Sequence, residues 1–174
     1  MIDELWRKCV QFHGHECPGL AIGFKVCEAA MLRMGLEFST DEEVVCVTEN
    51  DACGVDAVQV IAGCTFGKGN LIYRPVGKMA FTFFTRSDGK GERFVLRPDD
   101  TNMTKEERLS RILGSDAGDL LDIGDPGVSL PNKAKIYRSV SCQICHERTA
   151  EPMMRVSEGK IVCIDCFKTK VSEP

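Results

Sequence analysis

Two pairs of cysteines near the C-terminus constrain this chain more than any other feature. Cys142 and Cys145 form one Cys-x-x-Cys motif, Cys163 and Cys166 form a second, and 17 residues separate the two pairs. Each pair presents two thiolates from a tight turn, and this spacing is typical of a closed, tetrahedral, structural zinc site. A rubredoxin-like iron site is the alternative occupant. The intervening hairpin pattern and a short helix from Phe167 predict a treble-clef or ribbon-type zinc finger. Such a small unit depends on the metal for its folding free energy.

The rest of the chain has the composition of an ordinary globular protein. Its 174 residues are 43% hydrophobic and 28% charged, which excludes disordered and fibrous classes. The formal net charge of −4 argues against a basic coat that binds nucleic acid. No apolar run approaches the roughly 18 residues of a membrane span, and charged residues near the N-terminus interrupt any signal peptide. We therefore expect a cytoplasmic protein without a membrane partner, whose cysteines are mostly reduced.

Hydrophobic periodicity predicts an α+β fold with helices packed on a mostly antiparallel sheet. The expected helices cover residues 2–12, 17–34, 54–62 and 104–113. The expected strands cover residues 44–48, 71–73, 79–85 and 92–97, and the last three are predicted to form an antiparallel meander. Residues 114–135 are rich in Gly, Asp and Pro and are predicted to be a linker. The predicted domains are a core at 1–132 and a finger domain at 133–174.

A second group of potential ligands lies near the N-terminus. The segment FHGHECPG brings His13, His15 and Cys17 within five residues, and Cys17 and Cys53 both sit at predicted helix N-termini, which favour thiolates. We expect His15, Cys17 and Cys53 to bind a transition metal such as Zn, Ni or Fe, with an open coordination position. Cys64 is a candidate fourth ligand or reactive thiol. The alternative is that these thiols pack in the core, which we favour for Cys9, Cys27 and Cys46.

The glycine-rich loop GCTFGKGN, residues 63–70, is a candidate anion site. Its backbone N–H groups can surround an anion, and Lys68 adds positive charge. The predicted cofactor-binding residues are Gly67, Lys68, Gly69 and Asn70. The predicted catalytic residues are Cys17, Cys53, Cys64 and Lys68. The loop is not a Walker A motif, because Gly69 stands where Ser or Thr is required. A plain tight turn is the alternative that stays open.

Four motifs taken in order resemble a known family. HGHECPG, DACGVDAVQ, GCTFGKGNL and the paired Cys-x-x-Cys motifs are similar to those of the E subunit of formylmethanofuran dehydrogenase and its relatives. The resemblance spans nearly the whole chain. It implies an α+β core with a C-terminal zinc finger, an intimate dimer, and a link to the molybdenum or tungsten enzyme that fixes carbon dioxide as formylmethanofuran. The residues at the family's motif positions are His13, His15, Cys17, Asp51, Cys53, Asp56, Cys64, Lys68 and Asn70.

These observations lead to two principal hypotheses. In the first, the chain is a metal-dependent protein of one-carbon or molybdopterin-linked redox metabolism, such as an oxidoreductase subunit, that forms a homodimer with exchanged fingers. In the second, it is a non-enzymatic assembly or regulatory subunit whose finger docks on a protein partner or nucleic acid. Residues 133–174 carry eight Lys and Arg against five Asp and Glu, a field too weak to indicate nucleic acid. Thiol redox exchange between Cys17 and Cys53 ranks third.

Overall fold

The chain folds into two compact units, Met1–Ala134 and Lys135–Pro174. A computed structural model describes residues 2–98 and 102–171. The N-terminal unit contains α1 (Ile2–His13), α2 (Pro18–Met34), β1 (Val44–Thr48), α3 (Gly54–Ala62), β2 (Leu71–Tyr73), β3 (Ala80–Thr85), β4 (Gly91–Leu96), α4 (Lys105–Gly114), α5 (Ala117–Leu120) and β5 (Leu121–Gly124). The C-terminal unit contains β6 (Ser139–Ser141), β7 (Arg148–Ala150), a 3-10 turn η1 (Glu151–Met153), β8 (Met154–Ser157), β9 (Lys160–Cys163) and α6 (Ile164–Val171).

The N-terminal unit is built on a five-stranded sheet with the order β2-β1-β3-β4-β5. All neighbouring strands are antiparallel except β1 and β2, which confirms the mostly antiparallel prediction. The meander prediction is wrong for β2, because β2 pairs in parallel with β1 rather than with β3. The helix α3 connects β1 to β2, and such a crossover connection returns the chain in the same direction. The sheet therefore places the start of α3 beside the end of β1.

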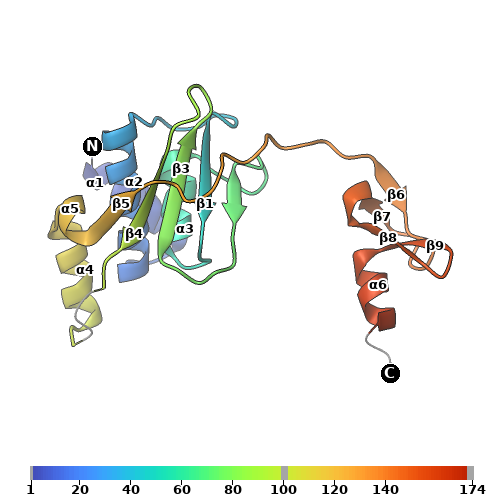
Figure 1. Cartoon of the computed structure of the whole chain (residues 1–174). Helices are drawn as coiled ribbons and strands as arrows, with labels where there is room; N and C mark the ends of the chain where they lie inside the picture. Colours follow the sequence, from blue (N-terminus) through green and yellow to red (C-terminus); the bar gives the residue numbers. More distant parts are fainter. Residues whose placement is uncertain (1, 99–101, 172–174) are drawn as a thin grey trace. The chain divides into compact units, whose positions relative to one another are not determined.

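The helices α2 and α3 pack on one face of this sheet, and α1 packs against these two helices (Figure 1). Alternate residues of β1 and β3 face them, so Cys46, Phe81 and Phe83 join the main hydrophobic core with α2 and α3. The opposite face carries a smaller cluster of Val45, Val47 and Phe84, against which Val128 and Leu130 pack. The N-terminal unit therefore has a core made entirely of its own side chains.

Glycines allow α2 and α3 to approach closely. A Cβ atom added at Gly23 would lie 2.1 Å from the carbonyl oxygen of Gly54, a distance at which something must shift. Gly54 itself lies against Gly19 and Gly23 of α2. This crossing brings the N-terminal ends of the two helices together, and with them Cys17 and Cys53, which precede the helices.

The linker prediction for 114–135 is wrong at its beginning. Residues Ala117–Gly124 form α5 and β5, and β5 pairs with the edge strand β4. Leu120 and Leu121 are buried, and these two apolar side chains outweigh the surrounding Gly and Asp residues. The predicted capping box at the start of α4 is present, with Thr104 and Glu107 bonding each other's backbone N–H groups.

The C-terminal unit has almost no apolar core of its own. It consists of two hairpins, β6-β7 and β8-β9, followed by α6. Its buried residues are Cys142, Val162 and Cys163, with Met154, Cys166 and Phe167 packed against them. Half of these six residues are cysteines from the two Cys-x-x-Cys motifs, so cysteine sulfurs rather than apolar side chains occupy the centre of this unit.

Candidate metal centres

Three side chains from three helices meet at one end of the N-terminal unit. His13 is the last residue of α1, Cys17 precedes α2, and Cys53 precedes α3. Each offers one potential ligand atom, and these atoms lie within 4.8 Å of one another. One imidazole and two thiols at such distances form a candidate metal site, for which the described residues offer these three ligands.

The local sequence explains how these side chains converge. Gly14 adopts a left-handed backbone conformation with φ of +93°, which ends α1 directly after His13. Cys17 then caps α2, and its sulfur accepts a hydrogen bond from the backbone N–H of Leu20 at 3.3 Å. A Cβ atom at Gly19 would lie 3.2 Å from the Cβ of Cys53. Because glycine stands there, α2 can approach the second thiol.

A carboxylate fixes the orientation of the histidine. Nδ1 of His13 lies 2.7 Å from Oδ2 of Asp56, and Nε2 lies 3.6 Å from the sulfur of Cys17. Gln59 donates a hydrogen bond to the other oxygen of Asp56 at 3.2 Å. A carboxylate on one imidazole nitrogen and a ligand position on the other is the arrangement that metal-binding histidines usually show.

The surroundings of Cys53 do not favour its thiolate. Burial raises the pKa of Cys53, and the neighbouring Cys17 and Asp56 raise it further. Thiols of this kind become thiolates when a cation binds them, because the metal competes with the proton. The donor set therefore fits a metal ion better than it fits a free nucleophile.

The structure replaces one of the histidines predicted from the sequence. His15 is exposed and does not join the group formed by Cys17 and Cys53; that place belongs to His13. The two imidazole rings lie 4.6 Å apart between centroids. The reason is that His13 completes the last turn of α1 and faces α3, whereas His15 follows the turn at Gly14. The helix-ending glycine was the signal in the sequence that separates the two.

Cys64 does not join the group either. Its side chain is fully buried, and its thiol donates to the carbonyl oxygen of Val44 at 3.5 Å. Burial raises its pKa to about 12. The other three thiols expected in the core, Cys9, Cys27 and Cys46, are buried as well. Cys64 is therefore placed like these core thiols, away from the proposed ligand and nucleophile roles.

The glycine-rich loop uses its polar groups internally. The ammonium group of Lys68 donates to the carbonyl oxygen of Ser39 at 2.6 Å. Asn70 is buried, and its side chain donates to the carbonyl oxygen of Val44 at 2.9 Å and accepts from the N–H of Thr65 at 2.9 Å. These contacts tie the loop to the start of β1. They favour the tight-turn interpretation, including for Gly67 and Gly69, over the anion site.

A pocket of about 380 Å³ adjoins the three-residue group. It lies between the end of β1, the start of α3 and the glycine-rich loop. Its lining consists of His13, Thr48, Asn50, Asp51, Ala52, Cys53, Val55, Asp56, Gln59, Phe66 and Tyr73. A ligand in this pocket would therefore meet the histidine and one of the thiols directly.

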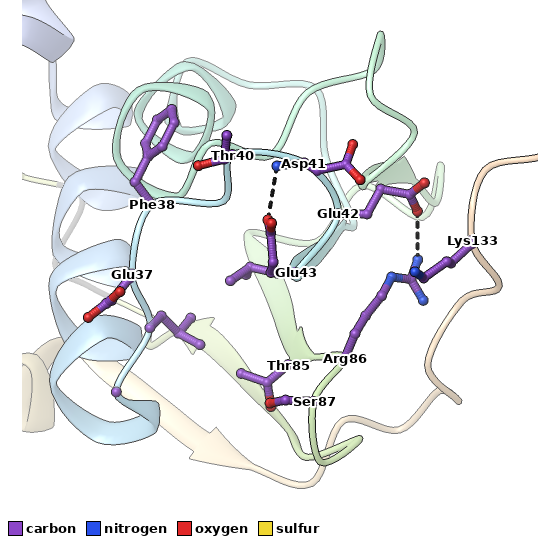
Figure 2. Close-up of a pocket in the computed structure, with 13 residues that line it drawn as sticks. Glu37, Phe38, Thr40, Asp41, Glu42, Glu43, Thr85, Arg86, Ser87 and Lys133 are labelled. Carbon is purple, nitrogen blue, oxygen red and sulfur yellow. Dashed lines mark hydrogen bonds and ion pairs between the residues drawn. The ribbon is translucent and has the colours of Figure 1, made fainter.

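A larger pocket elsewhere contains none of the residues predicted from the sequence. It measures about 720 Å³ and lies between the segment that follows α2 and the turn after β3 (Figure 2). Its charged groups pair mainly with one another: Arg86 binds Glu42 at 3.1 Å, and Glu43 accepts from the backbone N–H of Asp41. The charged groups of this pocket are therefore engaged with one another. Among the described residues, no group of potential metal ligands lies in this pocket.

The second centre is the four-cysteine group of the C-terminal unit. The sulfurs of Cys142, Cys145, Cys163 and Cys166 lie within 4.8 Å of one another. Backbone N–H groups point at two of them: Ile144 and Cys163 donate to Cys142, and Cys166 donates to Cys163. Burial opposes ionisation of Cys142, but these N–H groups lower its pKa to about 6. Four sulfurs with this support form a closed structural zinc site.

Together, the fold and the two centres define a class of protein: an α+β core with an imidazole–thiol metal site, joined to a four-cysteine zinc finger. The family described as "FmdE, Molybdenum formylmethanofuran dehydrogenase operon" matches residues 12–117, and the chain belongs to this family. The prokaryotic dksA/traR C4-type zinc finger matches residues 135–170. The four-cysteine centre lies within this second match, as the sequence predicts.

Two individual proteins resemble parts or all of the chain. Over 96 residues it is 38% identical to a probable S-adenosyl-L-methionine-binding protein of Archaeoglobus fulgidus, a match that covers 53% of this chain and 26% of that protein. The chain thus spans about a quarter of that relative. The crystal structure of a tungsten formylmethanofuran dehydrogenase FmdE-like protein from Syntrophus aciditrophicus covers 99% of this chain, with 94% of its own covered. Its TM-score is 0.72 at 24% identity, which shows a shared fold.

Membrane association through a spanning helix finds no support in the described residues. Among residues 2–98 and 102–171, every helix is too short or too polar to cross a bilayer.

Proposed function

We propose that the core site binds one transition metal through His13, Cys17 and Cys53, and that the protein acts at this metal in one-carbon or molybdopterin-linked redox metabolism. The observation that carries the proposal is the chain of contacts from Asp56 through His13 to the two thiols. Structural zinc sites are closed by four protein ligands, whereas sites that act on a substrate keep a position open. The core site has three ligands and an adjoining pocket, so it resembles catalytic metal sites rather than structural ones.

The residues present fit Zn, Ni or Fe as the bound ion. Soft sulfur with imidazole selects such metals over Mg²⁺ or Ca²⁺. When bound, the metal would supply Lewis acidity at a substrate or water in the open position. Asp56 lies on the Nδ1 side of His13, so Nε2 is the ring nitrogen that would face the ion. Cys17 is 5% exposed, so bulk water has little access to this ligand.

The physiological setting is proposed from the family. Its description names the operon of the molybdenum formylmethanofuran dehydrogenase, which supports an association with a molybdenum or tungsten enzyme. We extend the proposal to a homodimer with exchanged zinc fingers. Exchange of a small metal-stabilised unit between protomers requires little free energy, because each finger keeps the same contacts in the dimer. On this proposal the chain is a subunit that contributes the metal site to a larger oxidoreductase.

A matched pair of histidine variants tests the metal site. His13→Ala should remove one metal per chain while the zinc of the finger remains, and His15→Ala should keep both metals. Elemental analysis by plasma mass spectrometry, on full-length protein purified without chelator, measures both. Retention of two metals by His13→Ala, or loss of one by His15→Ala, would refute the assigned ligand set.

A specific surface feature favours a second candidate function, an assembly or regulatory subunit. Val156 and Ile161 face each other across β8 and β9, and their side chains are 74% and 45% exposed. An exposed apolar pair on a zinc finger suits docking on a protein partner. This candidate predicts one metal per chain and core thiols that resist iodoacetamide in the folded protein. Two metals per chain would favour the first candidate.

A further inference from the structure

The pocket beside the core site has two exposed aromatic residues in its lining. Phe66 comes from the glycine-rich loop and Tyr73 from the end of β2, and they are 64% and 40% exposed. His13 and Cys53, two of the three candidate metal ligands, line the same pocket. A ligand in this pocket would therefore meet aromatic rings as well as metal-binding side chains.

The charge of the pocket is negative. Its lining includes the carboxylates Asp51 and Asp56 and contains no Lys or Arg, all eleven lining residues being within the described part of the chain. Lys68, the basic residue of the neighbouring loop, is held by the carbonyl oxygens of Ser39 and Thr40 and does not line the pocket. A divalent metal would be neutralised by the two thiolates, so its presence would leave the two carboxylates uncompensated.

The two carboxylates are not equivalent. Asp56 is committed to His13 and Gln59. Asp51 is exposed, and no residue of the described ranges hydrogen-bonds or pairs with its carboxylate. Asp51 is thus the group of this pocket that remains available to a ligand, beside two aromatic rings that attract positive charge through their faces.

We propose that this pocket selects a small organic cation, bearing an ammonium or quaternary ammonium group, which Asp51 and the rings of Phe66 and Tyr73 receive. The proposal deepens the proposed function and rests on it, because His13 and Cys53 of the metal centre line the pocket. It replaces the anionic ligand that the glycine-rich loop suggested. A phosphate or carboxylate group would meet Asp51 and Asp56 without a balancing cation.

A pair of probes that differ only in charge tests the proposal. Choline and 3,3-dimethyl-1-butanol share a shape and a hydroxyl group, but only choline is positively charged. Its quaternary nitrogen has no lone pair, so binding cannot be coordination of an amine to the metal. Titration calorimetry or NMR on the zinc-loaded full chain should give choline an affinity about 10-fold higher than that of the alcohol.

Variants locate the effect. Asp51→Asn should reduce the affinity for choline about 5-fold and leave the alcohol unchanged, whereas Asp41→Asn, an exposed carboxylate of the other pocket, should change neither. Tyr73→Leu should weaken choline binding, and Tyr73→Phe should restore it. Equal affinity for both probes, no binding of either, or an unaffected Asp51→Asn variant would overturn the proposal.

The metal content of each sample separates this proposal from the proposed function. A chain that prefers choline but carries only the zinc of the finger would retain the cation pocket and refute the metal centre. A chain with two metals and no preference for choline would do the opposite. Asp51 is not a ligand of the core site, so its variant should keep both metals.

Discussion

The two cysteine-containing centres of this protein use similar ligands for opposite purposes. In the C-terminal unit, sulfurs occupy the position of a hydrophobic core, and few apolar side chains are buried around them. In the N-terminal unit, the thiols lie at the edge of a large core, in which Cys17 is one of many buried residues and against which Cys53 packs. The metal organises the fold in the first case, and the fold organises the metal site in the second. Ligand type alone therefore does not reveal the role of a metal; the amount of independent packing around it does.

The groups around the sulfurs also differ between the two centres, and they shift the thiol pKa in opposite directions. Backbone N–H groups donate to Cys142 and Cys163 in the finger, and they lower the pKa of Cys142 to about 6. At the core site, burial and neighbouring groups raise the pKa of Cys53. The backbone N–H groups in the finger thus favour the thiolate of Cys142, whereas the surroundings of Cys53 favour its thiol.

The largest effect is expected when the finger loses a ligand. Cys163→Ser should unfold the C-terminal unit, because binding of structural zinc contributes about 10–16 kcal/mol to such domains. The helical circular dichroism of the N-terminal unit should remain, and so should the metal at His13. If the Cys163→Ser variant showed no cooperative unfolding transition on heating, the two units would not fold independently.

The N-terminal unit should respond to packing rather than to metal. Gly23→Ala places a methyl group against the backbone of Gly54 and should lower the free energy of unfolding by about 3 kcal/mol. Gly114→Ala, in α4, is the control, since its Cβ meets no atom within 4 Å. Chemical denaturation measures both variants. A Gly23→Ala variant as stable as Gly114→Ala would mean that the α2–α3 crossing is less tight than described.

A smaller effect is expected at the carboxylate behind the histidine. Asp56→Asn removes the group that orients His13 and should reduce the metal affinity of the core site about 10-fold, without affecting the finger. Competition with a chromophoric chelator measures the change. Asp51→Asn, in the same pocket, is the matched control. If both variants bind metal as the native protein does, the Asp56–His13 contact has no role in metal binding.

The smallest effect concerns an ion pair in the scaffold. Two hydrogen bonds from Arg93, at 2.6 and 3.0 Å, lower the pKa of the buried Glu49 below its ordinary value of 4.5. The charged form is favoured in the folded state, so the stabilisation is complete above pH 4.5 and is lost as the pH falls through the lowered pKa.

The matching variant is Glu49→Gln, which should lower the free energy of unfolding by about 1 kcal/mol at neutral pH and by less in acid. Urea denaturation of both proteins across this pH range gives the difference. A penalty that is constant with pH would contradict the role assigned to the charge.

Several parts of this structure could be predicted from sequence because the signals are local. The Cys-x-x-Cys spacing identifies the four ligands of the finger, and apolar periodicity identifies the helices α1 to α3. The capping pattern of Thr104 and Glu107 likewise marks the start of α4. In each case neighbouring residues carry the physical cause, so no knowledge of the tertiary structure is required.

The structure departs from the expectations where a distant contact decides the outcome. The choice between His13 and His15 depends on which of them faces Asp56, 43 residues away from His13. Lys68 carries the positive charge expected of an anion site, but its ammonium group donates a hydrogen bond to the carbonyl oxygen of Ser39. The strand β5 was missed because its pairing with β4 is not visible in its own short sequence.

The central claim is that one chain holds two metal ions, one that supports the finger and one that acts in the core. Crystallographic anomalous scattering at the absorption edges of Zn, Ni and Fe, on protein purified without chelator, tests it most directly. The account predicts two peaks per chain, one among the four sulfurs of the finger and one between His13, Cys17 and Cys53. A single peak at the finger, with the core site empty of any metal, would contradict it.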